Sequence, residues 1–457
     1  MTDTPPPQPP QPQFDADQPH QLRPKLRKVR GFPVGAQGPD GKQQVLLGLA
    51  DAQQISDKMV ATAPAAQTIL PLFDGSRTPD EVATEVGKGC TPEFVENLVA
   101  QLDDAGLLEG PRFDQMLTTF REQFDSSDTL PPGSSVQMAE ALAGQALGED
   151  STEEERQAAA PDKLREAFDQ WIDQALSKAT DPSLDELPKA IVAPHIDYPR
   201  GWINYGAIWG RLRVADRPDR VVILGTNHFG FASGVCGCDK GFESPFGVCE
   251  ADTELIDRLG EALGEENKAK LFEHRYDHER EHSIELQIPW IQHCLGANDA
   301  GEFPKVFGVL IHDPAVNNGE SYDGNGLALE PFIEAMKKVL AALPGRTLVV
   351  SSADLSHVGP AFGDQQKLAG EEEDAKAFRE QIARQDQELL KFVVDRKPDE
   401  LVASMAWQQN PTRWCSTGNL VATLKIVEPD EVKLFSYVAA MDPQGASLVS
   451  QAALAMR

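Results

Sequence analysis

The sequence predicts an α/β fold, a sandwich on a largely parallel sheet, preceded by a small helical domain. Short apolar runs typical of buried strands recur from residue 188 onward: "KAIVAPH", "DRVVILGTNH", "FPKVFGVLIHD" and "RTLVVSSADLSH". Stretches of helical length separate these runs, and such alternation is typical of parallel sheets. The chain has 457 residues, which favours two or three domains.

Composition and charge limit the classes of partner. Hydrophobic residues make up 40% of the chain and charged residues 25%, which is typical of a globular protein. No run approaches the ~18 apolar residues that a membrane span requires. The formal net charge of -30 opposes binding to phosphate backbones and anionic lipids. We therefore expect a soluble protein that binds neither nucleic acid nor membrane.

Residues 1–30 are rich in proline and glutamine and are predicted to form a disordered tail. They contain no apolar segment of the kind found in secretory signals. The basic run "RPKLRKVRG" at 23–31 is interpreted as a solvated edge. Six cysteines lie scattered along the chain and favour free thiols over a disulfide framework. The expected location is the cytoplasm.

Residues 31–124 are predicted to form a compact domain of their own. A Gly-Pro-Asp-Gly sequence at 38–41 predicts the turn of a hairpin. Thr78, followed by Pro79 and by Glu81 three residues on, predicts a helix that starts with a capping box. A second Thr-Pro pair at 91–92 predicts the start of the next helix in the same way.

Two short capped helices followed by "GLLE" suggest a winged helix. The stretch 45–110 resembles the winged-helix peptide-recognition domains related to the peptide chaperone of pyrroloquinoline quinone biosynthesis, with "LFDGSRTPDEV" and "LVAQLDDAGLLEG" as the matching pieces. The resemblance implies a peptide or protein partner. A domain that only packs against the rest of the chain is the alternative. DNA binding ranks lower, because the helix over 92–105 carries no lysine or arginine.

Residues 125–187 are predicted to be a linker followed by helices. "DSSDTLPPGSS" at 125–135 has the Ser/Pro/Gly content of a linker. "KLREAFDQWIDQAL" further on is amphipathic, and we expect it to pack on the next domain. That domain is predicted to cover residues 188–457.

Histidines and acids follow the predicted strands where each strand ends. His195 ends one strand, His228 ends another, and Asp354 and His357 follow a third. Ligands of open α/β sheets bind outside the carboxyl ends of strands. Two neutral imidazoles there are good ligands for zinc, copper or iron. The residues alone leave the third ligand open among Cys415, Asp197, Glu285 and Asp354. The C-x-C pair at 236 and 238 lacks the spacing of a zinc site and is interpreted as structural.

Several motifs in residues 188 to roughly 440 resemble, in order, those of the Memo family, known in bacteria as AmmeMemoRadiSam system protein B. "APHIDY" matches the family's "APHAGY", "ILGTNHF" matches "ILGPSHH", "EHSIELQIP" matches "EHSIE" with its Leu-Pro pair, and "SSADLSH" matches "SSDFSH". "RWCSTGN" is similar to the family's Thr-x-Cys-Gly element. This chain departs from the pattern at Ile196-Asp197, at Phe229 and at Ser416.

The resemblance implies a metal site formed by His195, His228 and Cys415. It also implies a fold similar to the class III extradiol ring-cleavage dioxygenases, in which His357 would be the acid/base beside the metal. Asp354, in the same motif, is the second candidate for a catalytic residue. The residues expected to surround and orient the ligands are Asp197, His282 and Glu285. A soft thiolate in the ligand set favours copper or iron.

These observations predict a copper- or iron-dependent oxidoreductase with a dioxygenase-like site that acts on a small organic molecule or a peptide. The first alternative is a metal-binding interaction protein without turnover, in which the N-terminal domain recruits a partner. A second alternative is a zinc hydrolase that uses His195, Asp197, His228 and Asp354.

Overall fold

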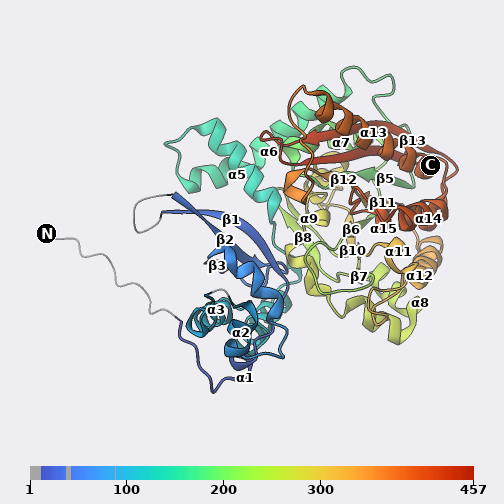
Figure 1. Ribbon diagram of the computed structural model, residues 1–457. Helices are drawn as coiled ribbons and strands as arrows, with labels where there is room; N and C mark the ends of the chain where they lie inside the picture. Colours follow the sequence, from blue (N-terminus) through green and yellow to red (C-terminus); the bar gives the residue numbers. More distant parts are fainter. Residues whose placement is uncertain (1–11, 38–42, 88) are drawn as a thin grey trace. The chain divides into compact units, whose positions relative to one another are not determined.

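The computed structural model describes residues 12–37, 43–87 and 89–457, and it divides the chain into two compact units (Figure 1). The first unit is Met1–Ser126 and the second is Ser127–Arg457. Both helices and strands are present, so the predicted α/β class is confirmed. None of the helices in the described ranges combines the length and the apolar character needed to cross a bilayer.

The first unit combines a three-stranded antiparallel sheet, in the order β1-β2-β3, with a set of short helices. Its described elements are α1 (Pro19–Leu22), β1 (Val29–Gln37), β2 (Gln43–Asp51), β3 (Met59–Thr62), η1 (Pro64–Thr68), η2 (Leu70–Leu72), α2 (Pro79–Val86), α3 (Pro92–Asp104) and α4 (Pro111–Asp125). Its core contains Val82 of α2, Leu98 and Leu102 of α3, and Leu49 of β2.

Local sequence signals explain how these elements begin. Thr78 and Glu81 form the predicted capping box at the start of α2. Thr91 caps α3 by accepting a hydrogen bond from the backbone N–H of Phe94. β1 and β2 pair as an antiparallel hairpin with Gln37 opposite Gln43, while the predicted turn at 38–41 lies outside the described residues.

The predicted tail differs from the structure wherever its residues are described. Residues 1–11 lie outside the described residues, but 12–30 contain α1 and the start of β1. Arg27, expected on a solvated edge, is buried and forms a bidentate ion pair with Asp51, with N–O distances of 3.1 Å. A buried arginine needs such a partner, and Asp51 lies 24 residues away on β2, beyond the reach of a local pattern.

The second unit begins with the stretch predicted as a linker, and this stretch is tied to the unit by backbone pairing. β4 (Thr129–Leu130) pairs in parallel with β8 (Gly241–Ser244). Lys240 donates a hydrogen bond to the carbonyl of Ser127. Residues 127–130 therefore form part of a folded sheet.

An eight-stranded mixed sheet forms the centre of this unit. Its strand order is β12-β14-β5-β11-β6-β10-β7, and β13 pairs with β14. β5 (Ala190–Ala193), β11 (Thr347–Ser352), β6 (Arg220–Thr226) and β10 (Lys305–Ile311) run parallel. The antiparallel strands are β12 (Asp354–Val358), β13 (Val432–Met441), β14 (Leu448–Met456) and β7 (Cys236–Gly237). The parallel centre carries the strand ends that the sequence singled out.

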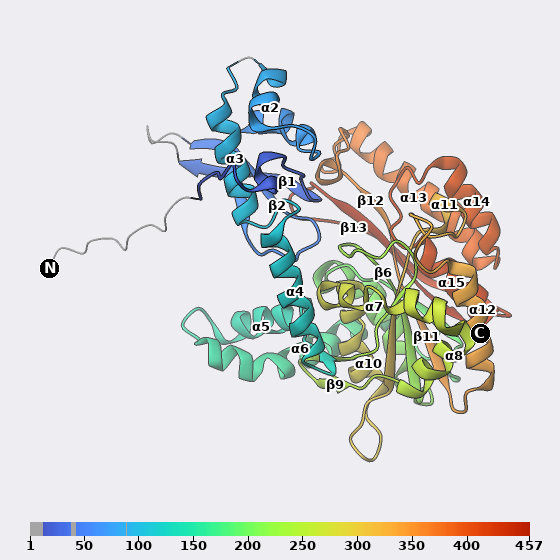
Figure 2. The ribbon, with the colours of Figure 1, turned by 90° about the horizontal axis from the view of Figure 1, so that it is seen from below.

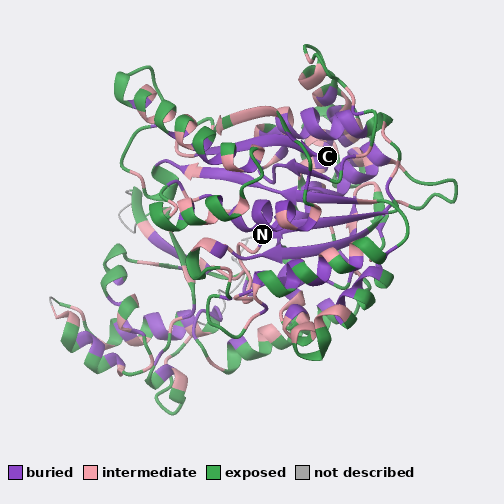
Figure 3. Ribbon diagram, turned by 90° about the vertical axis from the view of Figure 1, so that its right-hand side faces the viewer, coloured by how far each residue is buried: buried purple, intermediate pink, exposed green. Residues whose placement is uncertain are grey.

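Helices cover both faces of the sheet, which is buried along its central strands (Figures 2 and 3). On one face α15 (Thr417–Val427) packs on β11 and β6, with α12 (Leu329–Ala342) and α8 (Thr253–Phe272) beside it. On the other, α7 (Tyr198–Trp209) packs on β5 and β14.

Behind α7 lies α6 (Glu153–Leu176), which contains the predicted amphipathic stretch. Phe168 of α6 stacks on Trp290 at 3.8 Å between ring centroids, so the predicted packing of this stretch on the main domain is confirmed.

The remaining elements of the second unit are α5 (Ser134–Leu147), η3 (Gly210–Val214), β9 (Gly247–Cys249), η4 (Arg275–Arg280), α9 (His282–Glu285), α10 (Ile288–Leu295), α11 (Pro314–Asn317), η5 (Pro360–Phe362), α13 (Glu373–Val394) and α14 (Pro398–Gln408).

The start of α15 approaches the end of β10 so closely that only glycine fits. A Cβ atom at Gly418 would overlap the backbone oxygen of His312. We expect Gly418→Ala to lower the free energy of unfolding by about 1–3 kcal/mol, because backbone must shift. Gly144→Ala in α5 is the control: its Cβ meets only ordinary contacts, and alanine favours a helix, so stability should not fall. Equal unfolding midpoints in denaturant for Gly418→Ala and the unsubstituted protein would contradict this close packing.

Candidate metal centre

Three polar side chains meet at the carboxyl edge of the parallel strands. His195 follows β5, His228 follows β6, and Asp354 follows β11, which lies between them. The imidazole rings of His195 and His228 reach across the end of β11, with 5.2 Å between centroids. The sheet thus brings together two histidines that are 33 positions apart in the sequence.

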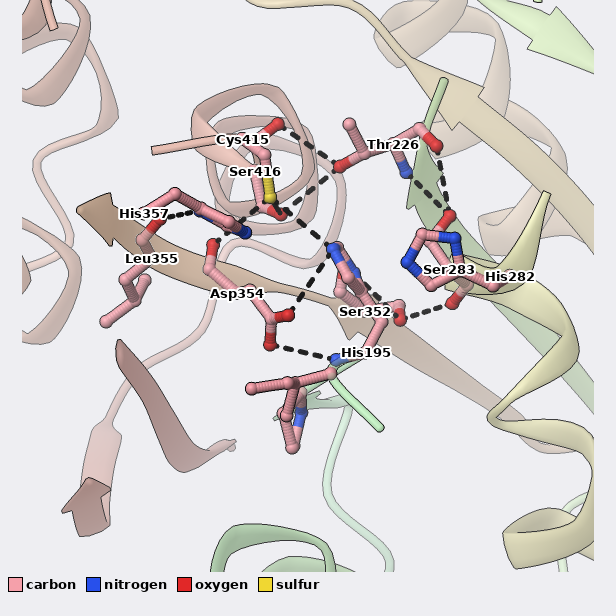
Figure 4. A network of polar contacts seen from close by, with 12 residues as sticks. His195, Thr226, His282, Ser283, Ser352, Asp354, Leu355, His357, Cys415 and Ser416 are labelled. Atoms are coloured by element: carbon pink, nitrogen blue, oxygen red, sulfur yellow. Dashed lines mark hydrogen bonds and ion pairs between the residues drawn. The ribbon is translucent and has the colours of Figure 1, made fainter. Parts of the chain in front are cut away.

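Cys415 reaches the same place from the loop that precedes α15 (Figure 4). Its Sγ lies 3.4 Å from Nε2 of His195 and 3.2 Å from Oγ of Ser416. One ligand atom each from His195, His228 and Cys415 can be chosen so that all three lie within 4.8 Å of one another.

His195 is nearly fully buried, and its surroundings define how the imidazole is oriented. Nδ1 lies 3.1 Å from the carbonyl of Ser352, to which it donates, and this leaves the lone pair of Nε2 directed at Cys415. Burial, followed by the neighbouring imidazoles of His228 and His282, lowers the pKa of His195 well below its ordinary value. A neutral imidazole is the form that binds a metal.

A buried carboxylate orients His228 in the way that the carbonyl of Ser352 orients His195, by accepting a hydrogen bond from Nδ1. Glu281 accepts from Nδ1 of His228 at 3.0 Å through Oε1 and from its backbone N–H at 2.8 Å through Oε2. Nε2 of His228 is then the ring nitrogen that can form the hydrogen bond with Cys415. Burial alone would lower the pKa of His228, but Glu281 and the hydrogen bond with Cys415 raise it well above the usual range.

Glu281 is the residue that the sequence analysis missed. It is the first glutamate of "EHSIE", a motif in which only His282 and Glu285 were considered. Its Oε1 also accepts from the backbone N–H of Ser283 and lies 3.3 Å from Nδ1 of His282. His228, Glu281 and His282 form a second group of ligand atoms within 4.8 Å of one another. The "EHSIE" motif indicated that a glutamate lies near the ligands, but nothing in the motif distinguishes Glu281 from Glu285.

The residues expected around the ligands have different surroundings. The ring of His282 stacks on His228, with 4.7 Å between centroids, so it lies beside the candidate ligands. Glu285 instead accepts from the backbone N–H groups of Gly133 and Ser135 at 3.2 and 3.1 Å, at the start of α5. Asp197 caps α7 and pairs with Arg200 at 2.6 Å.

Asp354 and His357 flank the cysteine from the side of β12. Oδ1 of Asp354 accepts from the backbone N–H of His195 at 3.0 Å, and Oδ2 lies 3.8 Å from Nε2 of that residue. Burial, only partly offset by hydrogen bonds from the backbone of His195 and Ile196, raises the pKa of Asp354 to about 7. Burial lowers the pKa of His357 to about 4, and its Nδ1 donates to the carbonyl of Leu355 at 2.9 Å.

The donor set fits a soft or borderline transition metal. Two imidazoles have Nδ1 committed to an oxygen acceptor and Nε2 directed at the same sulfur. Ligand bonds of ~2.0–2.3 Å to zinc or a similar metal place neighbouring ligand atoms ~3.3–3.7 Å apart in a tetrahedron, in agreement with the 3.4 Å between His195 and Cys415. Nitrogen and thiolate ligands favour copper, zinc or iron over magnesium or calcium.

The comparisons with known proteins agree with the motifs. The sequence profile of the family described as Memo-like protein matches residues 158–455, which is more than half of the chain. The chain belongs to this family. The match includes all the residues of the candidate metal centre and every strand of the main sheet, except for the last residue of β14. It begins within α6, thirty positions before the start predicted for the main domain.

Relatives of this Memo-like chain occur in bacteria and archaea. A MEMO1 family protein of Thermus thermophilus is 26% identical over 343 residues, which are 74% of this chain and 86% of that protein. One from Aquifex aeolicus is 25% identical over 323 residues, 69% of this chain and 72% of that protein. One from Desulfurococcus amylolyticus is 28% identical over 205 residues, 44% of this chain and 65% of that protein.

The carboxylate of Glu281 should contribute to metal affinity. Glu281→Gln keeps the shape of the side chain but weakens the bond that orients His228, so we expect affinity for Co²⁺ to fall ~10–100-fold. Competition with a chromophoric chelator measures this change. Glu279→Gln, which removes a nearby charge without a hydrogen bond to His228, should leave affinity close to that of the unsubstituted protein. Equal losses in both variants would show a general charge effect instead.

Proposed function

We propose that this Memo-like protein is a metal-dependent oxidoreductase, with copper or iron held by His195, His228 and Cys415. One observation carries the proposal: two imidazoles and a thiol from distant segments direct their free ligand atoms at one point. A bound copper or iron ion would supply one-electron redox chemistry, including reaction with O₂. A small organic molecule or a peptide is the proposed substrate class.

Two groups beside the ligands can hold or accept a proton. With a pKa of about 4, His357 is neutral at pH 7 and can accept a proton from a substrate hydroxyl. With a pKa of about 7, Asp354 is close to half protonated at neutral pH. A proton acceptor and a group that can donate a proton beside the ligands support the proposed catalytic role of these two residues. His282, stacked on His228, would limit the freedom of that ligand.

The fold supports a dioxygenase-like site, because the candidate residues lie at the carboxyl ends of parallel strands, where α/β proteins bind ligands. The class III extradiol type remains part of this proposal. Zinc hydrolysis through His195, Asp197, His228 and Asp354 is less favoured, because Asp197 is half-exposed and engaged by Arg200.

Metal content and oxygen uptake test the proposal. Anaerobically purified protein should contain copper or iron and should consume O₂ with a suitable reductant or catechol-type substrate. His195→Ala removes a ligand and should lose the metal. His357→Ala should retain metal and fold while turnover falls ~100-fold, the usual contribution of a positioned proton-transfer group.

Two results would contradict the catalytic proposal. One is oxygen uptake that His357→Ala leaves unchanged. The other is wild-type protein that binds copper or iron tightly but consumes no O₂ with any reductant or catechol offered. A metal-binding interaction protein would then be the better description. Tight binding of zinc alone, with hydrolysis of an ester substrate that His195→Ala abolishes, would favour the zinc hydrolase.

A specific observation favours a protein partner for the first unit, which we propose to be a winged-helix domain. A groove of about 260 Å³ crosses its hairpin, lined by Gly31, Phe32, Pro33, Val45, Leu46, Leu47, Pro64 and Gln67. Val45 on its rim is 62% exposed. Apolar surface of this kind is typical of peptide-binding grooves.

Substitution in the groove tests this partner. Val45→Lys should abolish binding of apolar peptides to the full chain, because it introduces a charge at an apolar contact, and fluorescence titration measures the loss. Glu85→Lys, an exposed change on α2 away from the groove, is the control. Peptide binding that survives Val45→Lys, or no peptide binding by the unsubstituted chain, would favour a domain with only a structural role.

A further inference from the structure

A second buried carboxylate lies behind the candidate metal centre. Asp386, in the middle of α13, is fully buried. Its Oδ1 accepts from Oγ of Ser356 at 2.5 Å and from Nε1 of Trp414 at 2.7 Å. Its Oδ2 accepts from the hydroxyl of Tyr437 at 2.7 Å and from Oγ of Ser450 at 2.5 Å. All four donors are uncharged, and no ion pair within the described ranges includes Asp386.

Such an arrangement is costly, because a buried charge without a cation depends entirely on its hydrogen bonds. Here the four donors come from four separate segments: β12, β13, β14 and the loop before α15. Helix α13 is therefore joined through one side chain to three strands and a loop. Loss of the carboxylate would remove an acceptor from all four donors, three of which are on buried residues.

Two of these donors directly precede residues of the candidate metal centre. Ser356 is followed by His357, and Trp414 is followed by Cys415. Ser356 faces α13, where its hydroxyl donates to Asp386, while the side chain of His357 lies beside Cys415 (Figure 4). Asp386 thus holds, from behind, the two segments that carry the thiol and the proton-accepting imidazole.

The loop that carries Cys415 needs such an anchor. Gln409, Asn410 and Arg413 have positive φ angles of 57°, 46° and 57°, a left-handed conformation that asparagine tolerates but that is uncommon for glutamine and arginine. Trp414 is held at both ends, since its backbone N–H donates to Oδ1 of Asn410 at 2.8 Å and its Nε1 donates to Asp386.

The loop is also tied directly to the strand of His357. The backbone N–H of His357 donates to the carbonyl of Thr412 at 2.8 Å, and Nε of Arg413 donates to the carbonyl of His357 at 2.8 Å. The loop and β12 are therefore held together at the site by these bonds and, behind it, by Asp386.

We propose that Asp386 is a positioning residue, which sets the placement of Cys415 and His357 through Trp414 and Ser356. The role assigned to these two side chains rests on the proposed function. The competing interpretation is that Asp386 only stabilises the packing of α13. The two interpretations differ in which donor matters, because the hydroxyl of Tyr437 supports β13 and no segment of the site.

Three variants of the full chain separate these interpretations. Ser356→Ala and Trp414→Phe each remove a bond to Asp386 on the side of the site, and each also removes the 3.2 Å bond from Nε1 of Trp414 to Oγ of Ser356. Tyr437→Phe is the matched control that removes a bond to Asp386 on the other side. The first readout is the rate at which iodoacetamide alkylates Cys415 in metal-free protein, followed by mass spectrometry of its peptide. The second is affinity for Co²⁺, with the thiolate-to-cobalt absorption band as the signal. Unfolding midpoints in denaturant are measured for each variant.

We expect alkylation of Cys415 to accelerate at least about threefold in Ser356→Ala and Trp414→Phe, because the loop opens more often. Affinity for Co²⁺ should fall about tenfold in both, since ligand geometry depends on outer hydrogen bonds. Tyr437→Phe should stay within about twofold of the unsubstituted protein in both readouts, even if its stability falls. Asp386→Asn should show the combined effect.

Equal changes in the matched control and the other two variants would overturn the positioning role, as would unchanged alkylation and affinity in Ser356→Ala and Trp414→Phe. If Asp386→Asn does not fold, the single-donor variants still decide. Failure of the unsubstituted protein to bind Co²⁺ would count against the proposed metal centre, whereas the alkylation rates in metal-free protein would still test the placement of Cys415.

Discussion

The lateral order of β5, β11 and β6 is the constraint on which the candidate metal centre depends. Neighbouring strands lie about 4.8 Å apart, so β5 and β6 are separated by about twice that distance. Imidazoles at their ends can approach only by reaching across the end of β11, and this is what His195 and His228 do. Register matters equally, because a one-residue slip of β5 would turn His195 away from the site.

Buried carboxylates provide the second level of organisation in this acidic chain. Glu281 and Asp386 accept hydrogen bonds from separate segments, Asp354 accepts from the backbone after β5, and no salt bridge to a lysine or arginine within the described ranges includes any of the three. Glu281 orients an imidazole, Asp354 holds the backbone of His195, and Asp386 binds the strand and loop behind the site. A buried acid is stable only where donors converge, so each of these positions is fixed by several contacts at once.

Local signals were sufficient for many elements and insufficient for long-range contacts. The capping box of α2 and the apolar runs of the central strands were predictable, because each depends on residues within a few positions. The predicted tail was wrong for residues 12–30, because burial of Arg27 depends on Asp51 in a strand of its own unit. The pairing of β4 with β8 joins segments more than a hundred residues apart, and no local pattern predicts it.

The sequence by itself determined the mixed α/β class, the Memo-like motifs, and the placement of His195 and His228 after buried strands. Whether these side chains meet Cys415 was decided by the tertiary structure, because the order of strands and the placement of α15 bring them together. Tertiary structure also separated the two glutamates of "EHSIE". Glu281 faces His228, whereas Glu285 faces the start of α5, about 150 residues earlier in the chain. These two glutamates lie only four positions apart, but different segments pack against each of them and supply different hydrogen-bond partners. Which segments pack there is decided by the whole fold.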